Sequence, residues 1–173
     1  MSVTPRPATE LDRLLEDNSA YAAARADDGA MASARPRRQL AVVTCMDARI
    51  DVFAVLGLHL GEAHVLRNAG GRVTEDVLRS LALSTHVLGV RTAVIMQHTL
   101  CGLTGVTDAE LRERTGAELG FLPIDDHEAA LREDVDHLFA QPYLSLLTAV
   151  AGLIFDVETG RVRPIVTRER PPG

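Results

Sequence analysis

Three short apolar runs, each bounded by turn residues, constrain the fold of this chain more than any other feature. They read QLAVVT over residues 39–44, AHVLR over 63–67 and TAVIM over 92–96. Uninterrupted apolar runs of this length are typical of strands that are covered on both faces, as in parallel sheets. Helical patterns follow the second and third runs, as the crossovers between parallel strands require. The sequence therefore predicts an α/β fold with a mainly parallel sheet flanked by helices.

Capping residues and apolar periodicity place the helices. We predict helices over 9–25 with Thr9 as cap, from Thr74 to Gly89, from the capping box of Thr107 and Glu110 to Gly116, and from a capping box of Asp125 and Glu128. The segments AVAGLIFDV and RVRPIV flank ETG, which predicts an antiparallel hairpin at a sheet edge near the C-terminus.

The N-terminal segment stands apart from this pattern. Residues 1–38 hold one helix and a linker, whereas residues 39–173 hold all the predicted strands. The helix has a narrow leucine stripe among many charges, which is too little apolar surface for a layer of its own. We therefore expect residues 1–38 to pack on a partner and residues 39–173 to form the domain that carries the active site.

Charge and hydropathy exclude several classes of partner. The formal net charge is −6, and no basic stripe is present. Arg35, Arg37 and Arg38 cluster on a Pro-containing segment, which we interpret as a solvated linker. No apolar stretch reaches bilayer length, and the opening MSVTPRPATELDR lacks the apolar region of a secretion signal. We therefore expect no nucleic acid, no membrane contact and a cytoplasmic location.

The two cysteines, Cys45 and Cys101, are open to two interpretations. A structural disulfide is not expected in a reducing compartment. They are either unrelated buried thiols or two ligands of one metal. Cys45 ends the first predicted strand, and His98 and Cys101 follow the third with H-x-x-C spacing. Because the carboxyl ends of parallel strands meet at one edge, we expect all three side chains to converge there.

Two sulfurs and one imidazole nitrogen suit zinc. The fourth position would be filled by water, by Asp47 or by a second histidine. Three protein ligands with an exchangeable fourth position are typical of catalytic zinc, so we predict one Zn²⁺ per chain. The other histidines have no cysteine at ligand spacing and are assigned to packing or to the surface: His59, His64, His86, His127 and His137.

Asp47 and Arg49 follow Cys45 at alternate positions. They are either a surface ion pair or a functional dyad. As a dyad, the carboxylate would accept the proton of the activated water or compete for the metal, and the guanidinium would stabilise negative charge. We predict Asp47 and Arg49 as catalytic residues.

The motifs CMDAR, RNAGG and HTLCG together resemble the signature of the β-class carbonic anhydrases, and the resemblance extends from about Gln39 to Val166. It implies zinc held by Cys45, His98 and Cys101, an Asp47–Arg49 dyad, and a homodimer or a tetramer of dimers in which the N-terminal helix packs on the partner subunit. It also implies that the Gly102 N–H donates to bicarbonate. Gly70 and Gly71 either let backbone approach the substrate closely or form an ordinary turn.

The resemblance implies reversible hydration of carbon dioxide to bicarbonate. Carbonyl sulfide and carbon disulfide hydrolases of the same superfamily share these ligands, so either activity is the alternative. A non-catalytic, zinc-stabilised scaffold is the alternative of another class. The chain departs from many relatives at Leu100, where they carry an acid before the second cysteine.

Overall fold

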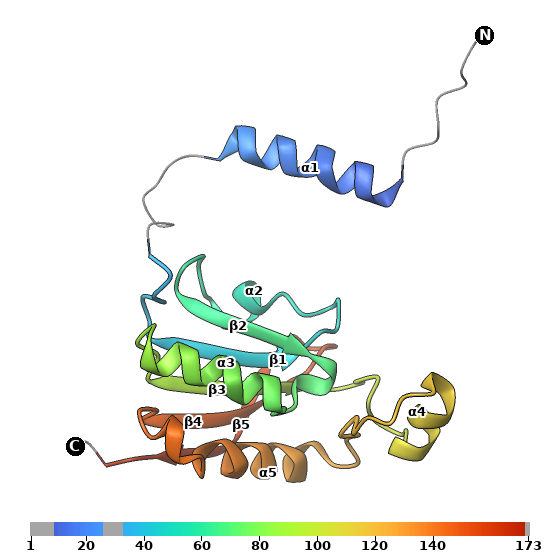
Figure 1. Cartoon of the computed structure of the whole chain (residues 1–173), viewed down its shortest axis with the longest axis vertical. Helices are drawn as coiled ribbons and strands as arrows, with labels where there is room; N and C mark the ends of the chain where they lie inside the picture. The colour runs from blue at the N-terminus through green and yellow to red at the C-terminus, as the bar shows by residue number, and fades with distance from the viewer. Residues whose placement is uncertain (1–8, 26–32, 172–173) are drawn as a thin grey trace. The chain divides into compact units, whose positions relative to one another are not determined.

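The computed structural model describes residues 9–25 and 33–171 (Figure 1). The chain divides into two units, Met1–Ala32 and Ser33–Gly173. The predicted division into residues 1–38 and 39–173 stays a prediction. Residues 1–8 and 26–32 of the N-terminal segment lie outside the described residues. In the first unit, α1 (Glu10–Ala24) begins at a capping box of Thr9 and Asp12, which confirms the predicted helix and its cap. No residue of α1 is buried within this unit.

The second unit is built on a five-stranded sheet with the order β2-β1-β3-β4-β5. The first four strands run parallel, and β5 pairs antiparallel with β4, as the sequence predicts. The strands are β1 (Leu40–Cys45), β2 (Ala63–Asn68), β3 (Thr92–His98), β4 (Ala149–Phe155) and β5 (Val162–Glu169). The helices of this unit are α2 (Val52–Leu56), α3 (Glu75–His86), α4 (Asp108–Thr115) and α5 (His127–Phe139), with short 3-10 turns η1 (Ala69–Gly71) and η2 (Pro142–Leu144).

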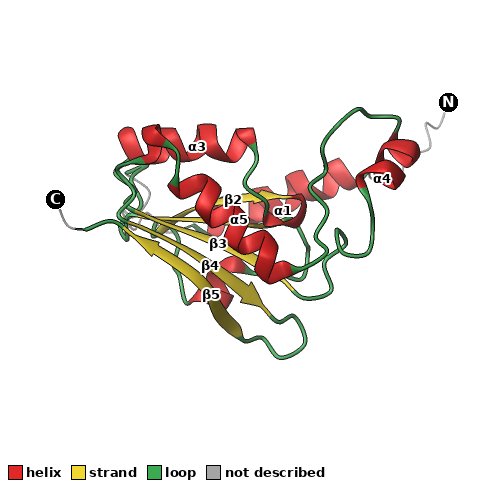
Figure 2. Ribbon diagram, turned by 90° about the horizontal axis from the view of Figure 1, so that it is seen from below, coloured by secondary structure: helices red, strands yellow, loops and turns green. Residues whose placement is uncertain are grey.

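Both faces of the sheet are covered. Along β1, Ala41 and Val43 pack into one cluster with α3 and α5, which lie on the same face of the sheet in Figure 2. Val42 packs into a second cluster with Val52 of α2. This two-sided burial explains why the strands are uninterrupted apolar runs rather than alternating ones.

Two predicted helix ends are wrong by a few residues. The cap of α5 is Asp126 rather than Asp125, because the Asp126 carboxylate accepts the Ala129 N–H. Both aspartates suit a cap by local propensity, so the sequence alone does not distinguish them. α3 ends at His86 rather than at Gly89, and Gly89 forms the following turn with φ +78°.

Three short elements were not predicted: α2, η1 and η2. Each spans five residues or fewer, too short to show apolar periodicity. α2 is held by its ends, because the Asp51 carboxylate accepts the Ala54 N–H and Gly57 caps the helix in the left-handed region. None of the described helices has both the length and the hydropathy needed to cross a bilayer.

Candidate metal centre

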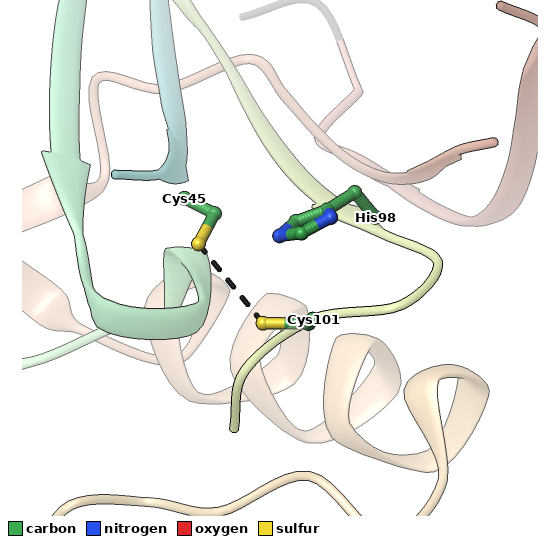
Figure 3. A group of neighbouring side chains, drawn as sticks. All are labelled: Cys45, His98 and Cys101. Carbon is green, nitrogen blue, oxygen red and sulfur yellow. Dashed lines mark hydrogen bonds between the residues drawn. The ribbon is translucent and has the colours of Figure 1, made fainter. Parts of the chain in front are cut away.

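Cys45, His98 and Cys101 meet at the carboxyl edge of the sheet (Figure 3). Cys45 is the last residue of β1, His98 is the last residue of β3, and Cys101 lies in the turn that follows β3. Their ligand atoms all lie within 4.8 Å of one another. The two sulfur atoms are 4.0 Å apart, close to the ~3.8 Å that a tetrahedral zinc with Zn–S bonds of ~2.3 Å requires. The structure thus brings together the three side chains that the sequence singled out as ligands.

The His98 ring is oriented for coordination. It is fully buried, and its Nδ1 lies 2.9 Å from the Thr99 carbonyl oxygen. Since that carbonyl can only accept, Nδ1 carries the proton and Nε2 presents its lone pair toward the sulfurs. Nε2 is buried and has no hydrogen-bond partner among the described residues. A buried nitrogen without a partner is costly, and a metal ion at this point would satisfy it.

Burial also sets the protonation of the metal-free site. It lowers the pKa of His98, so the imidazole is neutral and able to bind. It raises the pKa of the Cys101 thiol, and the neighbouring Cys45 adds to this effect. Metal binding therefore has to displace a thiol proton, as it does in other cysteine-containing sites.

Asp47 and Arg49 form a close pair beside the three ligands. The Arg49 Nη2 donates to Asp47 Oδ2 at 2.6 Å, and Arg49 Nε and backbone N–H both donate to Oδ1 at 2.9 Å. These hydrogen bonds hold the pKa of the Asp47 carboxyl well below its usual value. Asp47 Oδ2 also lies 3.7 Å from His98 Nε2. The carboxylate is thus ionised and lies between the guanidinium and the metal-binding atoms.

Arg49 connects the dyad to the turn that carries Cys101. Its Nη2 donates to the Leu100 carbonyl at 2.9 Å. Leu100 has φ +56°, a left-handed conformation that costs energy for a residue with a side chain. Leu100 is 61% exposed, so its identity affects the surface and not the ligand set.

A pocket of about 390 Å³ opens over this group. Apolar side chains from distant segments form its wall, including Leu111 of α4 and Phe121 beyond it. Neither residue is predicted from the sequence, since no local pattern places them near Cys45. The pocket is lined by Cys45, Met46, Asp47, Ala69, Gly70, Cys101, Gly102, Leu103, Leu111 and Phe121. A larger cavity of about 720 Å³ beside Thr99 and His127 contains none of the three ligands.

The predicted substrate-binding glycines occupy different places. Gly70 and Gly102 line the pocket. Gly71 does not line it and packs against the sheet, where an added Cβ would lie 3.0 Å from the Cys45 nitrogen and 3.1 Å from the Met96 oxygen. Both Gly70 and Gly71 have positive φ. Gly71 therefore lets the turn after β2 press against the backbone of a ligand residue.

The donor set fits zinc. Two thiolates and one neutral imidazole are soft to borderline ligands, and a fourth ligand could come from Asp47 or from solvent in the pocket that Cys45, Asp47 and Cys101 line. Among the residues that the structure describes, this is the one group of histidine, cysteine and acidic side chains close enough to hold a metal ion. Other histidines have different partners: His64 contacts Ser84, His86 contacts the Tyr143 carbonyl, and His127 contacts Gln97.

Comparisons with known proteins show which family the chain resembles. Residues 40–137 match the family model described as carbonic anhydrase. The chain is 38% identical over 136 residues to Beta-carbonic anhydrase 1 of Mycobacterium tuberculosis, covering 75% of this chain and 83% of that protein. It is 42% identical over 156 residues to a carbon disulfide hydrolase of an Acidianus species, covering 73% of this chain and 76% of that protein.

A crystal structure agrees with the sequence matches. The carbonic anhydrase of Streptococcus mutans superimposes with a TM-score of 0.81 at 38% identity, covering 93% of this chain and all of that one. The matched region contains the motifs around Cys45, Arg67 and His98. The chain therefore belongs to the β-class carbonic anhydrase family.

Proposed function

We propose that this protein is a zinc-dependent carbonic anhydrase that catalyses the reversible hydration of carbon dioxide to bicarbonate. One observation carries the proposal: three ligand atoms within 4.8 Å of one another face an ionised Asp47 at the base of a largely apolar pocket. The family supplies the reaction class. The geometry supplies the ligands, the charged dyad and the space for a small substrate.

Cys45, His98 and Cys101 would hold the zinc ion, which when bound supplies the Lewis acidity that makes water a nucleophile near neutral pH. The His98–Thr99 hydrogen bond fixes the imidazole tautomer that this requires. Asp47 is the acceptor next to the fourth ligand position. It orients the attacking water. Arg49 donates to both oxygens of this carboxylate and so keeps it ionised and in a fixed orientation.

Asp47 has a second possible role as a competing ligand. In the described arrangement it is paired with Arg49. Its Oδ2 lies only 3.7 Å from His98 Nε2, so a small rotation would bring it to the metal-binding atoms. We propose that Arg49 holds Asp47 in the arrangement that leaves the fourth position to solvent.

The apolar walls of the pocket suit a small substrate without charge. Carbon dioxide offers few hydrogen-bonding groups, and Leu103, Leu111 and Phe121 would exclude competing water from around it. We propose that the Gly102 N–H donates to the developing bicarbonate, and that Gly70 lets the backbone approach the product closely. For Gly71 we propose an indirect role, because it supports the backbone of Cys45.

Carbon disulfide or carbonyl sulfide hydrolysis is the second candidate. The identity to a carbon disulfide hydrolase, 42%, exceeds the 38% identity to Beta-carbonic anhydrase 1. The same ligands and dyad would serve a linear sulfur analogue of carbon dioxide. The distinction lies in the access to the pocket and its walls rather than in the metal ligands.

Side-by-side turnover decides between these functions. We expect the zinc-loaded protein to hydrate carbon dioxide in stopped-flow assays far faster than it hydrolyses carbonyl sulfide or carbon disulfide. Faster turnover of a sulfur substrate would establish the second candidate. Stoichiometric zinc with no turnover of any of the three would establish a zinc-stabilised scaffold.

We further propose a homodimer or a tetramer of dimers and a cytoplasmic location. The exposed face of α1, with Leu11, Leu14 and Leu15 each more than half exposed, supports the first proposal. The second is supported by the chemistry of Cys45 and Cys101, whose thiols lie 4.0 Å apart and have to stay reduced to bind a metal.

A further inference from the structure

Arg67 lies beside the metal centre without facing it. It is in β2, directly opposite Thr44 of the parallel strand β1. β1 ends one residue later at Cys45, and the chain then forms the loop that contains Asp47 and Arg49. The Arg67 side chain extends across this loop.

All three nitrogens of the Arg67 guanidinium donate to carbonyl oxygens of the loop. Nε donates to Cys45 at 2.9 Å, Nη2 to Asp47 at 2.6 Å and Nη1 to Ile50 at 3.1 Å. A guanidinium is planar and offers its donors in fixed directions, so it sets the relative positions of the carbonyls that it joins. No other side chain in the described part of the protein has hydrogen bonds to these three carbonyls.

The neighbouring residue supports the same loop from the backbone. The Asn68 carbonyl accepts the Met46 N–H at 2.8 Å. Within the loop, the Ile50 N–H donates to the Asp47 carbonyl at 3.1 Å, and the Arg49 N–H donates to the Asp47 carboxylate. The hydrogen bonds within the loop join Asp47 to Arg49 and Ile50, whereas the carbonyl of Cys45 and the N–H of Met46 are tied to β2.

We propose that Arg67 is a positioning residue for this reaction, which acts by fixing the backbone of Cys45 and Asp47. The inference rests on the proposed function for its effect on turnover. The peptide groups of a metal ligand and of the catalytic acceptor are held by one side chain. Without these hydrogen bonds, the Asp47 carboxylate could move away from the metal ligands. A displacement of about 1 Å can lower the rate by about 100-fold.

The test compares two lysine substitutions. Arg67→Lys keeps the charge and loses the fork that joins three carbonyls. Arg170→Lys is the matched control, because Arg170 also donates to two backbone carbonyls, those of Leu147 and Phe139, far along the chain from the metal ligands. For each protein we would measure zinc content, kcat/KM for carbon dioxide, and amide hydrogen exchange over residues 46–50.

We expect Arg67→Lys to keep close to one zinc per chain, to lose about 10- to 100-fold in kcat/KM and to exchange the Arg49 and Ile50 amides faster. Arg170→Lys should retain the wild-type kcat/KM and the wild-type exchange over this loop. Unchanged loop exchange in Arg67→Lys would overturn the assignment, and so would an equal loss of kcat/KM in both variants.

A second variant covers the case in which Arg67→Lys does not fold. In Arg67→Ala, added methylguanidinium should slow loop exchange and raise turnover, whereas methylammonium should do neither. Equal effects of the two cations would overturn the proposal, because they would show that charge alone suffices. Loop exchange requires no turnover. A wild-type protein inactive on carbon dioxide would therefore refute the proposed function, while exchange still decides the role of Arg67.

Discussion

At the scale of single residues, the metal centre is defined by one buried atom without a hydrogen-bond partner and by one carboxylate that is fully hydrogen-bonded. His98 Nε2 is the clearest case, since it is buried, faces two sulfurs and has no partner among the described residues. Asp47 is the complementary case, with an ionised carboxylate fully engaged by Arg49. A metal ion would satisfy the first atom, and we propose that the second orients water beside it.

The metal site predicts a clear difference between two histidines. His98→Gln should lose most of its zinc, because an amide is a poor replacement for imidazole in a thiolate-rich site. His137→Gln, on the exposed side of α5, should keep close to one zinc per chain. Cys45→Ser and Cys101→Ser should behave as His98→Gln does. Elemental analysis of the purified variants checks this, and full zinc retention in both cysteine variants would refute the ligand assignment.

The dyad predicts a pH profile. Because hydrogen bonds from Arg49 depress the pKa of Asp47, the carboxylate stays ionised from pH 6 to 9 and does not titrate there. A rise in activity over this range would therefore report the titration of the metal-bound water and not of Asp47. We expect such a rise with a midpoint above ~7, since two thiolates already neutralise the metal charge and leave its water less acidic than in a three-histidine site.

A substitution of the dyad tests the same point. Arg49→Ala should retain zinc but lose roughly 100-fold or more in kcat/KM, because Asp47 is then free to occupy the fourth position. The control is Arg79→Ala, which removes a surface pair of the same 2.6 Å length with Asp76. Stopped-flow hydration across pH measures both effects. A flat wild-type profile, with Arg49→Ala as active as Arg79→Ala, would mean that the dyad is only a surface ion pair.

At the scale of secondary-structure elements, the turn after β2 holds the end of β1 in place. Gly71 sits against the backbone of Thr44 and Cys45, and the preceding Arg67 and Asn68 support the loop that follows Cys45. The RNAGG motif thus acts on the site mainly through the backbone of the neighbouring strand, with Gly70 at the pocket wall.

Two glycines with similar positive φ separate conformational strain from steric contact. Gly160→Ala has open space around the new Cβ, so only the left-handed conformation should cost, about 1–2 kcal/mol. Gly71→Ala adds contacts with three backbone atoms at 3.0–3.1 Å and should lower the free energy of unfolding by ~3 kcal/mol or more. Urea unfolding measures both, and equal effects would contradict the packing role of Gly71.

At the scale of the whole molecule, α1 has no buried residue within its own unit. Its leucines 11, 14 and 15 are 64%, 58% and 58% exposed, and they recur at helical spacing. An isolated helix of 15 residues is marginal in water, so an apolar face of this kind needs a partner surface. The partner that we propose is a second copy of the chain.

Deleting residues 1–28 should therefore shift a dimer toward monomer or aggregate in light scattering. A second variant, Leu14→Gln with Leu15→Gln in the full-length chain, keeps the helix length and removes part of its apolar face. Both changes should weaken association. A truncated protein that remains a monodisperse dimer would show that α1 is not part of the interface.

The sequence by itself determined the architecture and the candidate ligands. Apolar runs without alternation indicate strands buried on both faces, and residues at the ends of such strands must meet at one edge of a parallel sheet. Cys45 and His98 are therefore placed by their position along the chain. The short H-x-x-C spacing then brings Cys101 to the same point.

Only the tertiary structure decided how the site is supported and enclosed. The three hydrogen bonds of Arg67, the contact of Gly71 with Cys45 and the walls formed by Leu111 and Phe121 join segments far apart in the chain. Such contacts depend on strand register and on the path of loops, neither of which leaves a periodic pattern. The cap of α5 is a further example, since two adjacent aspartates have equal local propensity and only the structure shows that Asp126 takes this position.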